Sequence, residues 1–275
     1  RGNFVGLPTD CPQRDERMGW TGDAQVFCKT ACYNMDSYAF FNKYTDDLME
    51  AQKPNGAITD VAPQVKWPNG HDLVLNGNAA WGDAIFIIPY TIYEMYGDTA
   101  ILEKCYRSMV KYFRQQLGTT KELLRPDFGF GDWLSIDDET PKDVMATAFF
   151  AYGAQIMSKV AGVLGKTDDA SYYSRMFEQI SSAWRKAYMD QDGRIKGDTQ
   201  CCYLMALKMN LLSEDTVSTA TAHLVRTIER KDYHLSTGFV GVSYLLPMLC
   251  SHGHTDIAYR LLLNDTYPSW GYSIK

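Results

Sequence analysis

The sequence predicts an all-α fold assembled from helical hairpins. Apolar and aromatic side chains recur at intervals of three and four residues along about nine segments, as on one face of a helix. Tight links between these segments alternate with longer irregular loops that are rich in glycine and proline. This alternation fits a ring of hairpins whose long loops gather at one end. A plain bundle or an α-solenoid is the alternative. No repeat with a period of about 34 to 45 residues is visible, which argues against a solenoid.

The first element is predicted as one long helix over residues 24 to about 50, because Val26, Ala31 and Met35 begin a helical apolar pattern. Pro54-Asn55-Gly56 ends that helix. Residues 55–78 then form a turn-rich loop with room for a short strand or two. A loop of this length inside a compact domain is usually functional.

Two further helices are expected over residues 79–96 and 99–117. Pro89 lies near the middle of the first of them and predicts a kink. Asp98 is placed to cap the second. Residues 118–140 are again irregular.

The carboxyl-terminal half continues the helical pattern after Pro141, a residue type favoured at the first helical position. Between two of its helices, Asp190-Gln191-Asp192-Gly193 predicts a tight turn that could join two short strands. The expected helices cover residues 141–164, 168–189, 199–208, 214–231, 239–250 and 255–263.

Composition excludes several classes of function. The formal charge of -6 argues against a nucleic-acid partner or an anionic membrane surface, and no apolar run is long enough to span a bilayer. The seven cysteines show no metal-ligand spacing, so mainly reduced, buried thiols and no structural zinc are expected. The run Asp137-Asp138-Glu139 lacks the EF-hand pattern and is expected in a solvated loop, at the rim of a cleft. We expect neither a metal nor a cofactor.

The most informative stretch is Asp10-Cys11-Pro12-Gln13-Arg14-Asp15-Glu16-Arg17-Met18-Gly19-Trp20-Thr21-Gly22-Asp23. Pro12 opposes a regular helix, so the stretch is predicted as an ordered loop that ends where a helix begins. If it is locally extended, Asp10, Arg14, Glu16 and Trp20 share one face. Carboxylates and arginine can hold sugar hydroxyl groups while an indole covers C–H surface. A structural knot of ion pairs is the alternative.

This stretch closely resembles the signature of bacterial α-L-rhamnosidases, inverting glycoside hydrolases with an (α/α)6 barrel. The resemblance continues, in the family's order, through Trp81-Gly82-Asp83-Ala84, Phe130-Gly131-Asp132-Trp133-Leu134, Thr237-Gly238-Phe239 and Trp270-Gly271-Tyr272. It implies one catalytic (α/α)6-barrel domain over residues 1–275, truncated at both ends, with about three helices outside. The implied substrate is a terminal α-L-rhamnoside of a glycoside or polysaccharide, and the implied partners are the remaining domains of the parent chain.

The resemblance also implies roles for individual residues. Glu16 is the general acid, since neighbouring carboxylates and aromatic walls would raise its pKa, whereas pairing with an arginine such as Arg14 or Arg17 would lower it. Asp23 has an alternative role at a helix N-terminus, the tryptophans have an alternative role in the core, and Asp83 has an alternative structural role. The implied substrate-binding residues are Asp10, Arg14, Trp20, Asp23, Trp81, Asp132 and Trp133.

The general base is expected elsewhere. In the family a glutamate follows the tryptophan-glycine motif, but no glutamate lies between His254 and Lys275. The base and a histidine after it are therefore expected beyond Lys275, and the chain alone is expected to be inactive. The alternatives are an inverting glycosidase of the same barrel acting on another sugar, or a non-catalytic carbohydrate-binding domain. No signal peptide is visible, and a periplasmic, secreted or cytoplasmic location all stay open. Surface or capping roles are expected for the histidines, which are His71, His223, His234, His252 and His254.

Overall fold

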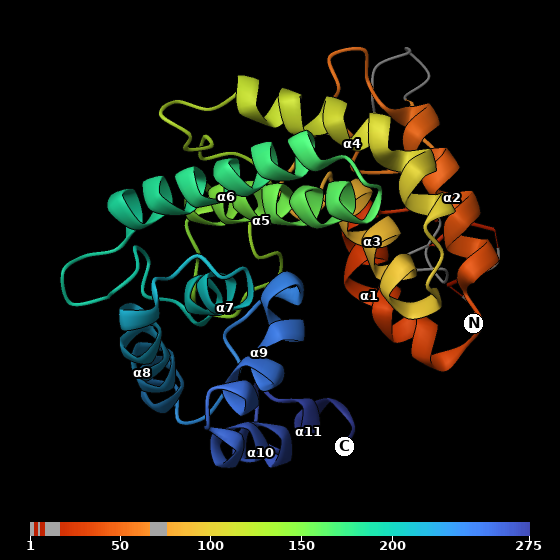
Figure 1. Ribbon diagram of the computed structural model, residues 1–275. Helices are drawn as coiled ribbons and strands as arrows, with labels where there is room; N and C mark the ends of the chain where they lie inside the picture. Colours follow the sequence, from red (N-terminus) through yellow and green to blue (C-terminus); the bar gives the residue numbers. More distant parts are fainter. Residues whose placement is uncertain (1–2, 5, 9–16, 67–75) are drawn as a thin grey trace. The chain divides into compact units, whose positions relative to one another are not determined.

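A computed structural model describes residues 3–4, 6–8, 17–66 and 76–275 (Figure 1). Within this part of the chain the regular structure is helical, and pairing between extended segments is limited to isolated bridges. The predicted all-α class is therefore confirmed. The helices are α1 (Thr21–Asn34), α2 (Tyr38–Ala51), α3 (Ala84–Tyr96), α4 (Ala100–Gly118), α5 (Lys142–Val163), α6 (Thr167–Tyr188), α7 (Gln200–Lys208), α8 (Glu214–Arg230), α9 (Phe239–Ser251), α10 (Thr255–Leu263) and α11 (Trp270–Ser273).

The chain divides into two compact units. Unit 1 comprises Arg1–Lys121 and Tyr152–Glu178, and unit 2 comprises Glu122–Ala151 and Gln179–Lys275. Helices α5 and α6 each contribute residues to both. The expectation of a single domain over residues 1–275 stays a prediction.

Helix α3 is the centre of unit 1 and packs against α1, α2 and α4 (Figure 1). Its side chains are apolar on most sides, and Ile85, Phe86 and Ile88 are fully buried. The Phe86 ring lies 5.4 Å, centroid to centroid, from Tyr112 of α4. Pro89 lies inside α3, where the sequence places it. A helix buried on several faces needs apolar residues all round, which is what this segment supplies.

The prediction of one long helix over residues 24 to about 50 is wrong, because α1 and α2 are separate helices. Met35 takes an extended conformation with φ at -160°. Beyond it, the Ser37 N–H donates to the Tyr96 hydroxyl at 3.1 Å and the Tyr38 N–H donates to the Asp36 carboxylate at 3.3 Å. These acceptors replace the carbonyls four residues back that a continuous helix would use. The apolar spacing hides the break because it continues on both sides of it.

Helix α3 begins at Ala84, later than the predicted residue 79. The residues before it form turns, and Ala80 has a positive φ of 69° that no helix accepts. The boundaries predicted for α4 to α10 agree to within one residue, whereas α1 begins three residues before the predicted residue 24 and the short helix α11 was not predicted. Asp98 does accept the Ala100 N–H at 2.9 Å.

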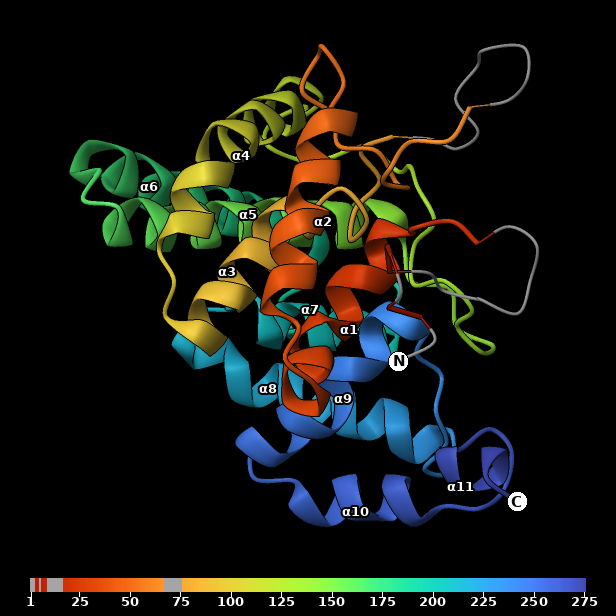
Figure 2. The ribbon, with the colours of Figure 1, turned by 90° about the vertical axis from the view of Figure 1, so that its right-hand side faces the viewer.

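Helix α7 is the centre of unit 2 and packs against α8 and α9. Helix α10 lies against α9, and α11 adjoins α10 (Figure 2). The Thr199 hydroxyl accepts the Cys202 N–H at 3.3 Å and so caps α7. The turn at residues 190–193 closes as predicted, but the two short strands reduce to one bridge between Met189 and Ile195.

The cysteines in the described part of the chain are unpaired thiols. Cys28, Cys105, Cys201 and Cys202 are buried, Cys32 is half-buried and Cys250 is exposed. The prediction of mainly reduced, buried cysteines is confirmed for these residues. None of the described helices has the length and hydropathy that crossing a membrane requires.

Candidate functional site

The predicted site divides between described and undescribed residues. Asp10, Arg14 and Glu16 lie outside the described part of the chain, so the proposed acid and two sugar contacts stay predictions. Trp20, Asp23 and Trp81 belong to unit 1. Asp132 and Trp133 belong to unit 2.

We call the stretch from Asp10 to Asp23 the acid motif. Its residues 19–21 are hydrogen-bonded to a second loop of unit 1, residues 60–62. The Ala62 N–H donates to the Gly19 carbonyl, and the Thr21 N–H donates to the Asp60 carbonyl, both at 2.9 Å. The Thr21 hydroxyl also donates to the Asp60 carbonyl at 3.1 Å. A Cβ atom on residue 19 would lie 2.2 Å from the Ala62 carbonyl oxygen, so this pairing requires glycine. The backbone three residues after Glu16 is thereby fixed.

Trp20 is half-buried and occupies the N-cap position of α1, while Asp23 lies in its first turn. Negative charge there is favoured by the helix dipole, so the predicted position of Asp23 near a helix start is confirmed. Asp23 also acts on the buried Tyr44, whose pKa is raised by burial and by the charges of Asp47 and Asp23. The Tyr44 hydroxyl donates to the Gly19 carbonyl at 3.1 Å and adds to the anchor.

Trp81 is a buried side chain, with only 3% of its surface exposed among the described residues. A Cβ atom on Gly22 would lie 2.7 Å from the Trp81 indole, so the indole packs directly on the first turn of α1. This contact favours the alternative that Trp81 belongs to the core. Its sugar contact stays a prediction.

Asp83 has the structural role that was the alternative to a substrate contact, because its carboxylate hydrogen-bonds within unit 1. One carboxylate oxygen accepts the Ala80 N–H and the other accepts the Gln116 side-chain amide, each at 2.8 Å. Asp83 is 1% exposed. It therefore fixes the strained turn at Ala80 that leads into α3.

Sequence reasoning missed Asp60, which is fully buried in the loop that anchors the acid motif. Its carboxylate accepts the Asn78 backbone N–H at 3.3 Å and also the Asn78 side-chain amide. Burial raises the pKa of Asp60 to about 7, although both hydrogen bonds from Asn78 act to lower it. In the sequence Asp60 looks like any other loop carboxylate. Only its burial distinguishes it.

In unit 2, Asp132 holds the start of α9. Its two carboxylate oxygens accept the Gly238 N–H at 2.6 Å and the Gly241 N–H at 2.9 Å. Burial raises the pKa of Asp132, while the hydrogen bonds from Gly241 and Gly238 oppose the rise. A Cβ atom on Gly238 would lie 2.3 Å from the carbonyl oxygens of Asp132 and Trp133, so glycine is required here as well. Asp132 therefore has a structural contact with the start of α9, and its sugar contact stays a prediction.

Trp133, by contrast, is 50% exposed. It lines an open pocket of about 550 Å³ in unit 2, together with Phe130, whose ring centroid lies 6.0 Å from that of Trp133. Aromatic faces beside carboxylates can receive the C–H and hydroxyl surfaces of a sugar. We call this the Trp133 pocket. It is lined by Phe130, Gly131, Asp132, Trp133, Leu134, Ser135, Asp137, Asp138, Glu139, Thr140 and Lys142, so the acidic run does lie at a rim.

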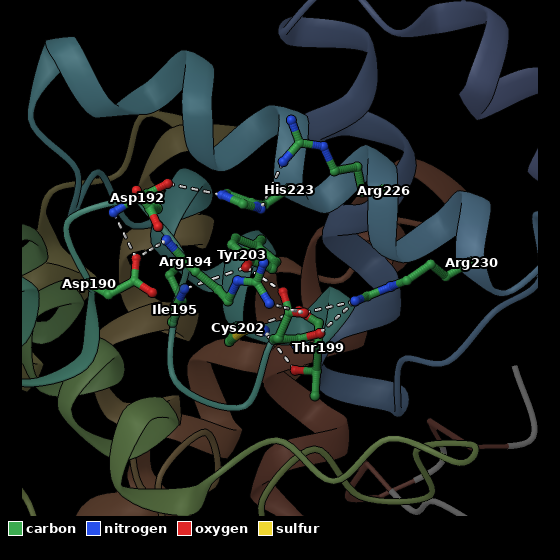
Figure 3. Close-up of polar contacts among 11 residues, drawn as sticks. Asp190, Asp192, Arg194, Ile195, Thr199, Cys202, Tyr203, His223, Arg226 and Arg230 are labelled. Carbon is green, nitrogen blue, oxygen red and sulfur yellow. Dashed lines mark hydrogen bonds and ion pairs between the residues drawn. The ribbon is translucent and has the colours of Figure 1, made fainter.

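Two of the described histidines lie where the sequence predicts them and one does not. His252 and His254 flank the turn between α9 and α10 as C-cap and N-cap residues, and His71 lies outside the described residues. His223 was expected in a surface or capping role, but its side chain on α8 is buried. Figure 3 shows its contacts with Asp192 and Arg226. Its ring stacks on Tyr203 with centroids 5.8 Å apart, and its Nε2 lies 3.0 Å from the Asp192 carbonyl oxygen.

Comparison with known proteins places these features in a family. The family described as the bacterial alpha-L-rhamnosidase 6 hairpin glycosidase domain matches residues 1–275. An alpha-L-rhamnosidase of Streptomyces avermitilis is 49% identical over 274 residues, which cover 100% of this chain and 26% of the relative. One from Formosa agariphila is 41% identical over 286 residues, covering 100% of this chain and 30% of the relative. The chain thus spans less than a third of the length of these relatives.

Solved structures agree. The Streptomyces avermitilis alpha-L-rhamnosidase complexed with L-rhamnose has a TM-score of 0.95 at 48% identity, covering 100% of this chain and 26% of that one. The Aspergillus terreus alpha-L-rhamnosidase has a TM-score of 0.90 at 29% identity, covering 99% of this chain and 32% of that one. These matches confirm the predicted six-hairpin fold class.

Proposed function

Because the chain belongs to the bacterial alpha-L-rhamnosidase six-hairpin glycosidase family, we propose that it contributes the general acid and part of the sugar site to an enzyme that hydrolyses terminal α-L-rhamnosides with inversion. The observation that carries the proposal is the family match over the whole chain. The intact stretch from Asp10 to Asp23, with its carboxylates, arginines and tryptophan, adds to it.

Glu16 donates its proton to the glycosidic oxygen while the bond from that oxygen to the anomeric carbon breaks. A second carboxylate removes a proton from a water molecule, and that water attacks the anomeric carbon from the opposite face. The products are free rhamnose of inverted configuration and the alcohol of the leaving group. In inverting enzymes the two carboxyl groups stand roughly 6.5–9.5 Å apart, which leaves room for the water.

The described structure supports this role for Glu16 through the anchor that follows it. Residues 19–21 are hydrogen-bonded to residues 60–62, so the chain leaves the motif at a fixed position. A proton donor must be held close to its acceptor to be effective, and small displacements are costly. Asp60, Tyr44 and Trp81 serve the mechanism by holding this segment.

Sugar contacts are proposed for Asp10, Arg14, Trp20 and Asp23 from the motif. Trp133 is a further candidate because its exposed indole can cover the apolar face of a sugar. Rhamnose carries a methyl group at C6, and an aromatic surface against such a methyl contributes about 1–3 kcal/mol of discrimination. Sugar contacts of Asp132 and Trp81 stay predictions from the motifs, and each side chain is buried against the backbone of a helix start.

The proposal is tested by assaying the full-length protein on a nitrophenyl α-L-rhamnoside and on the matching glucoside. Proton NMR during the first turnovers shows which anomer of the sugar appears first. We expect hydrolysis of the rhamnoside with β-rhamnose appearing first. Preference for the glucoside would favour another sugar, and initial release of α-rhamnose would contradict inversion.

A further inference from the structure

Unit 2 contains a second, basic pocket that the proposed reaction does not use. It has a volume of about 220 Å³ and lies between helix α8 and the loop that leads into α7 (Figure 3). Three guanidinium groups and two carboxylates line it, which leaves a surplus of one positive charge. The lining residues are Arg194, Asp198, His223, Arg226, Glu229 and Arg230.

Two of the arginines share a single carboxylate. Asp198 lies 2.9 Å from the Arg230 guanidinium and 3.7 Å from that of Arg194. The Tyr203 hydroxyl donates to its other oxygen at 2.6 Å. Burial acts to raise the pKa of Asp198, but the hydrogen bonds from Tyr203 and Arg230 outweigh it and the pKa is lowered. Asp198 is therefore a fixed anion shared by two guanidinium groups, and together with Glu229 it offsets two of the three positive charges of the pocket.

Arg226 contacts a histidine rather than a carboxylate. Its Nη1 lies 3.4 Å from Nδ1 of His223, and Nε2 of the same ring lies 3.0 Å from the Asp192 carbonyl oxygen. A guanidinium can only donate, so Nδ1 accepts and Nε2 carries the proton that it donates to Asp192. The His223 ring therefore positions Arg226, and no carboxylate takes part in this contact. The rest of this exposed guanidinium can receive an anion.

The loop side of the pocket is preorganised. The Asp190 carboxylate accepts the Asp192 N–H at 3.0 Å and the Arg194 N–H at 2.9 Å. These bonds hold the turn that presents Arg194 and the Asp192 carbonyl, so little ordering is needed when a ligand binds.

The basic pocket lies close to the Trp133 pocket within unit 2. Arg230 lines the basic pocket, and its neighbour Lys231 forms an ion pair with Asp138 of the Trp133 pocket at 3.0 Å. Adjacent residues at the carboxyl-terminal end of α8 therefore contact the linings of both pockets.

We propose that the basic pocket binds the carboxylate of a uronic acid residue in the substrate, so that the enzyme prefers rhamnose attached to an acidic saccharide. This rests on the proposed function. Guanidinium groups bind planar carboxylates through paired hydrogen bonds, whereas a neutral sugar in the same place leaves the positive charge unused.

The test compares two substrates of the full-length protein, a disaccharide of α-L-rhamnose linked to a uronic acid and the same disaccharide with its carboxyl group reduced. We expect kcat/KM to be about three- to tenfold higher for the acidic disaccharide, and this preference to shrink at high salt because the guanidinium groups are exposed. Arg226→Gln and Arg194→Gln should remove the preference and leave turnover of the reduced disaccharide unchanged. Arg175→Gln is the matched control, since Arg175 is an exposed arginine of α6 outside the pocket.

Equal kcat/KM for the two disaccharides, or equal losses on both in Arg226→Gln, would overturn the proposal. Inorganic sulfate should inhibit hydrolysis of the acidic disaccharide by occupying the basic pocket. Inhibition that is unchanged in Arg226→Gln would also overturn the proposal. If neither disaccharide is hydrolysed, the proposed function fails instead. Chemical-shift changes around Arg226 on titration with the free uronic acid then report on the pocket alone, and their absence would overturn it.

Discussion

Replacing Asp60 with asparagine should make the protein more stable at neutral and alkaline pH. The carboxyl group is fully buried, and its pKa is raised from 3.8 to about 7. A shift of this size corresponds to roughly 4 kcal/mol, at 1.36 kcal/mol for each pKa unit. A carboxyl group whose pKa is raised in the folded state makes its full contribution to the free energy of unfolding when the pH is below the pKa that it has in the unfolded chain. That contribution is lost as the pH rises through the folded pKa.

The hydrogen bonds around Asp60 allow the neutral form. The side-chain oxygen of Asn78 is buried and lacks a hydrogen-bond partner among the described residues. When the Asn78 amide turns over, this oxygen can accept a proton from neutral Asp60, or an N–H from an asparagine in its place. Asp60→Asn therefore imitates the protonated acid at every pH.

Urea unfolding followed by circular dichroism between pH 4 and pH 8.5 measures the effect. The variant should match the wild type near pH 4 and exceed it progressively, by up to about 4 kcal/mol, above pH 7. Glu50→Gln, which neutralises an exposed carboxylate of α2, should show no such divergence. A difference that does not change with pH, or a variant less stable than the wild type at pH 8, would refute the reasoning.

Three further substitutions separate packing from substrate contact. Gly22→Ala should cost about 1–3 kcal/mol in unfolding free energy because its Cβ overlaps the Trp81 indole, whereas Gly162→Ala, with open space around it, should cost nothing. Asp132→Ala should cost about 2–4 kcal/mol, since it leaves two buried N–H donors unpaired, and a variant as stable as the wild type would contradict the capping role. Trp133→Ala should raise KM for a rhamnoside about tenfold without changing the melting temperature by more than a degree or two, because the side chain is half exposed. An unchanged KM would remove Trp133 from the sugar site.

The sequence predicts a helix or turn well where the residues of that element alone carry the pattern that defines it. The apolar spacing of residues 214–231 predicts α8, and the turn at residues 190–193 is evident from its residues alone. The break between α1 and α2 was missed because the acceptor for the Ser37 N–H is the Tyr96 hydroxyl, from another helix far along the chain. Local patterns do not contain such partners.

The same limit applies to the site. The stretch around Glu16 is evident because residues with compatible chemistry lie together in the sequence. The role of Asp132 depends on Gly238, 106 positions later, and only the fold brings the two together. The raised pKa of Asp60 arises from burial, which is a property of the packed loop rather than of its sequence. Motifs therefore identify the chemistry, and the structure identifies the residues that support it.

The role of Glu16 as the proton donor is tested most directly by Glu16→Gln in the full-length protein, assayed on two rhamnosides whose leaving groups differ in acidity. A leaving group that needs a proton should lose about 10²–10⁴-fold in kcat, and a strongly acidic phenol, which departs without help, should lose far less. L-Rhamnose should still bind the variant. Equal losses on both substrates, or full activity on both, would contradict a general acid at Glu16.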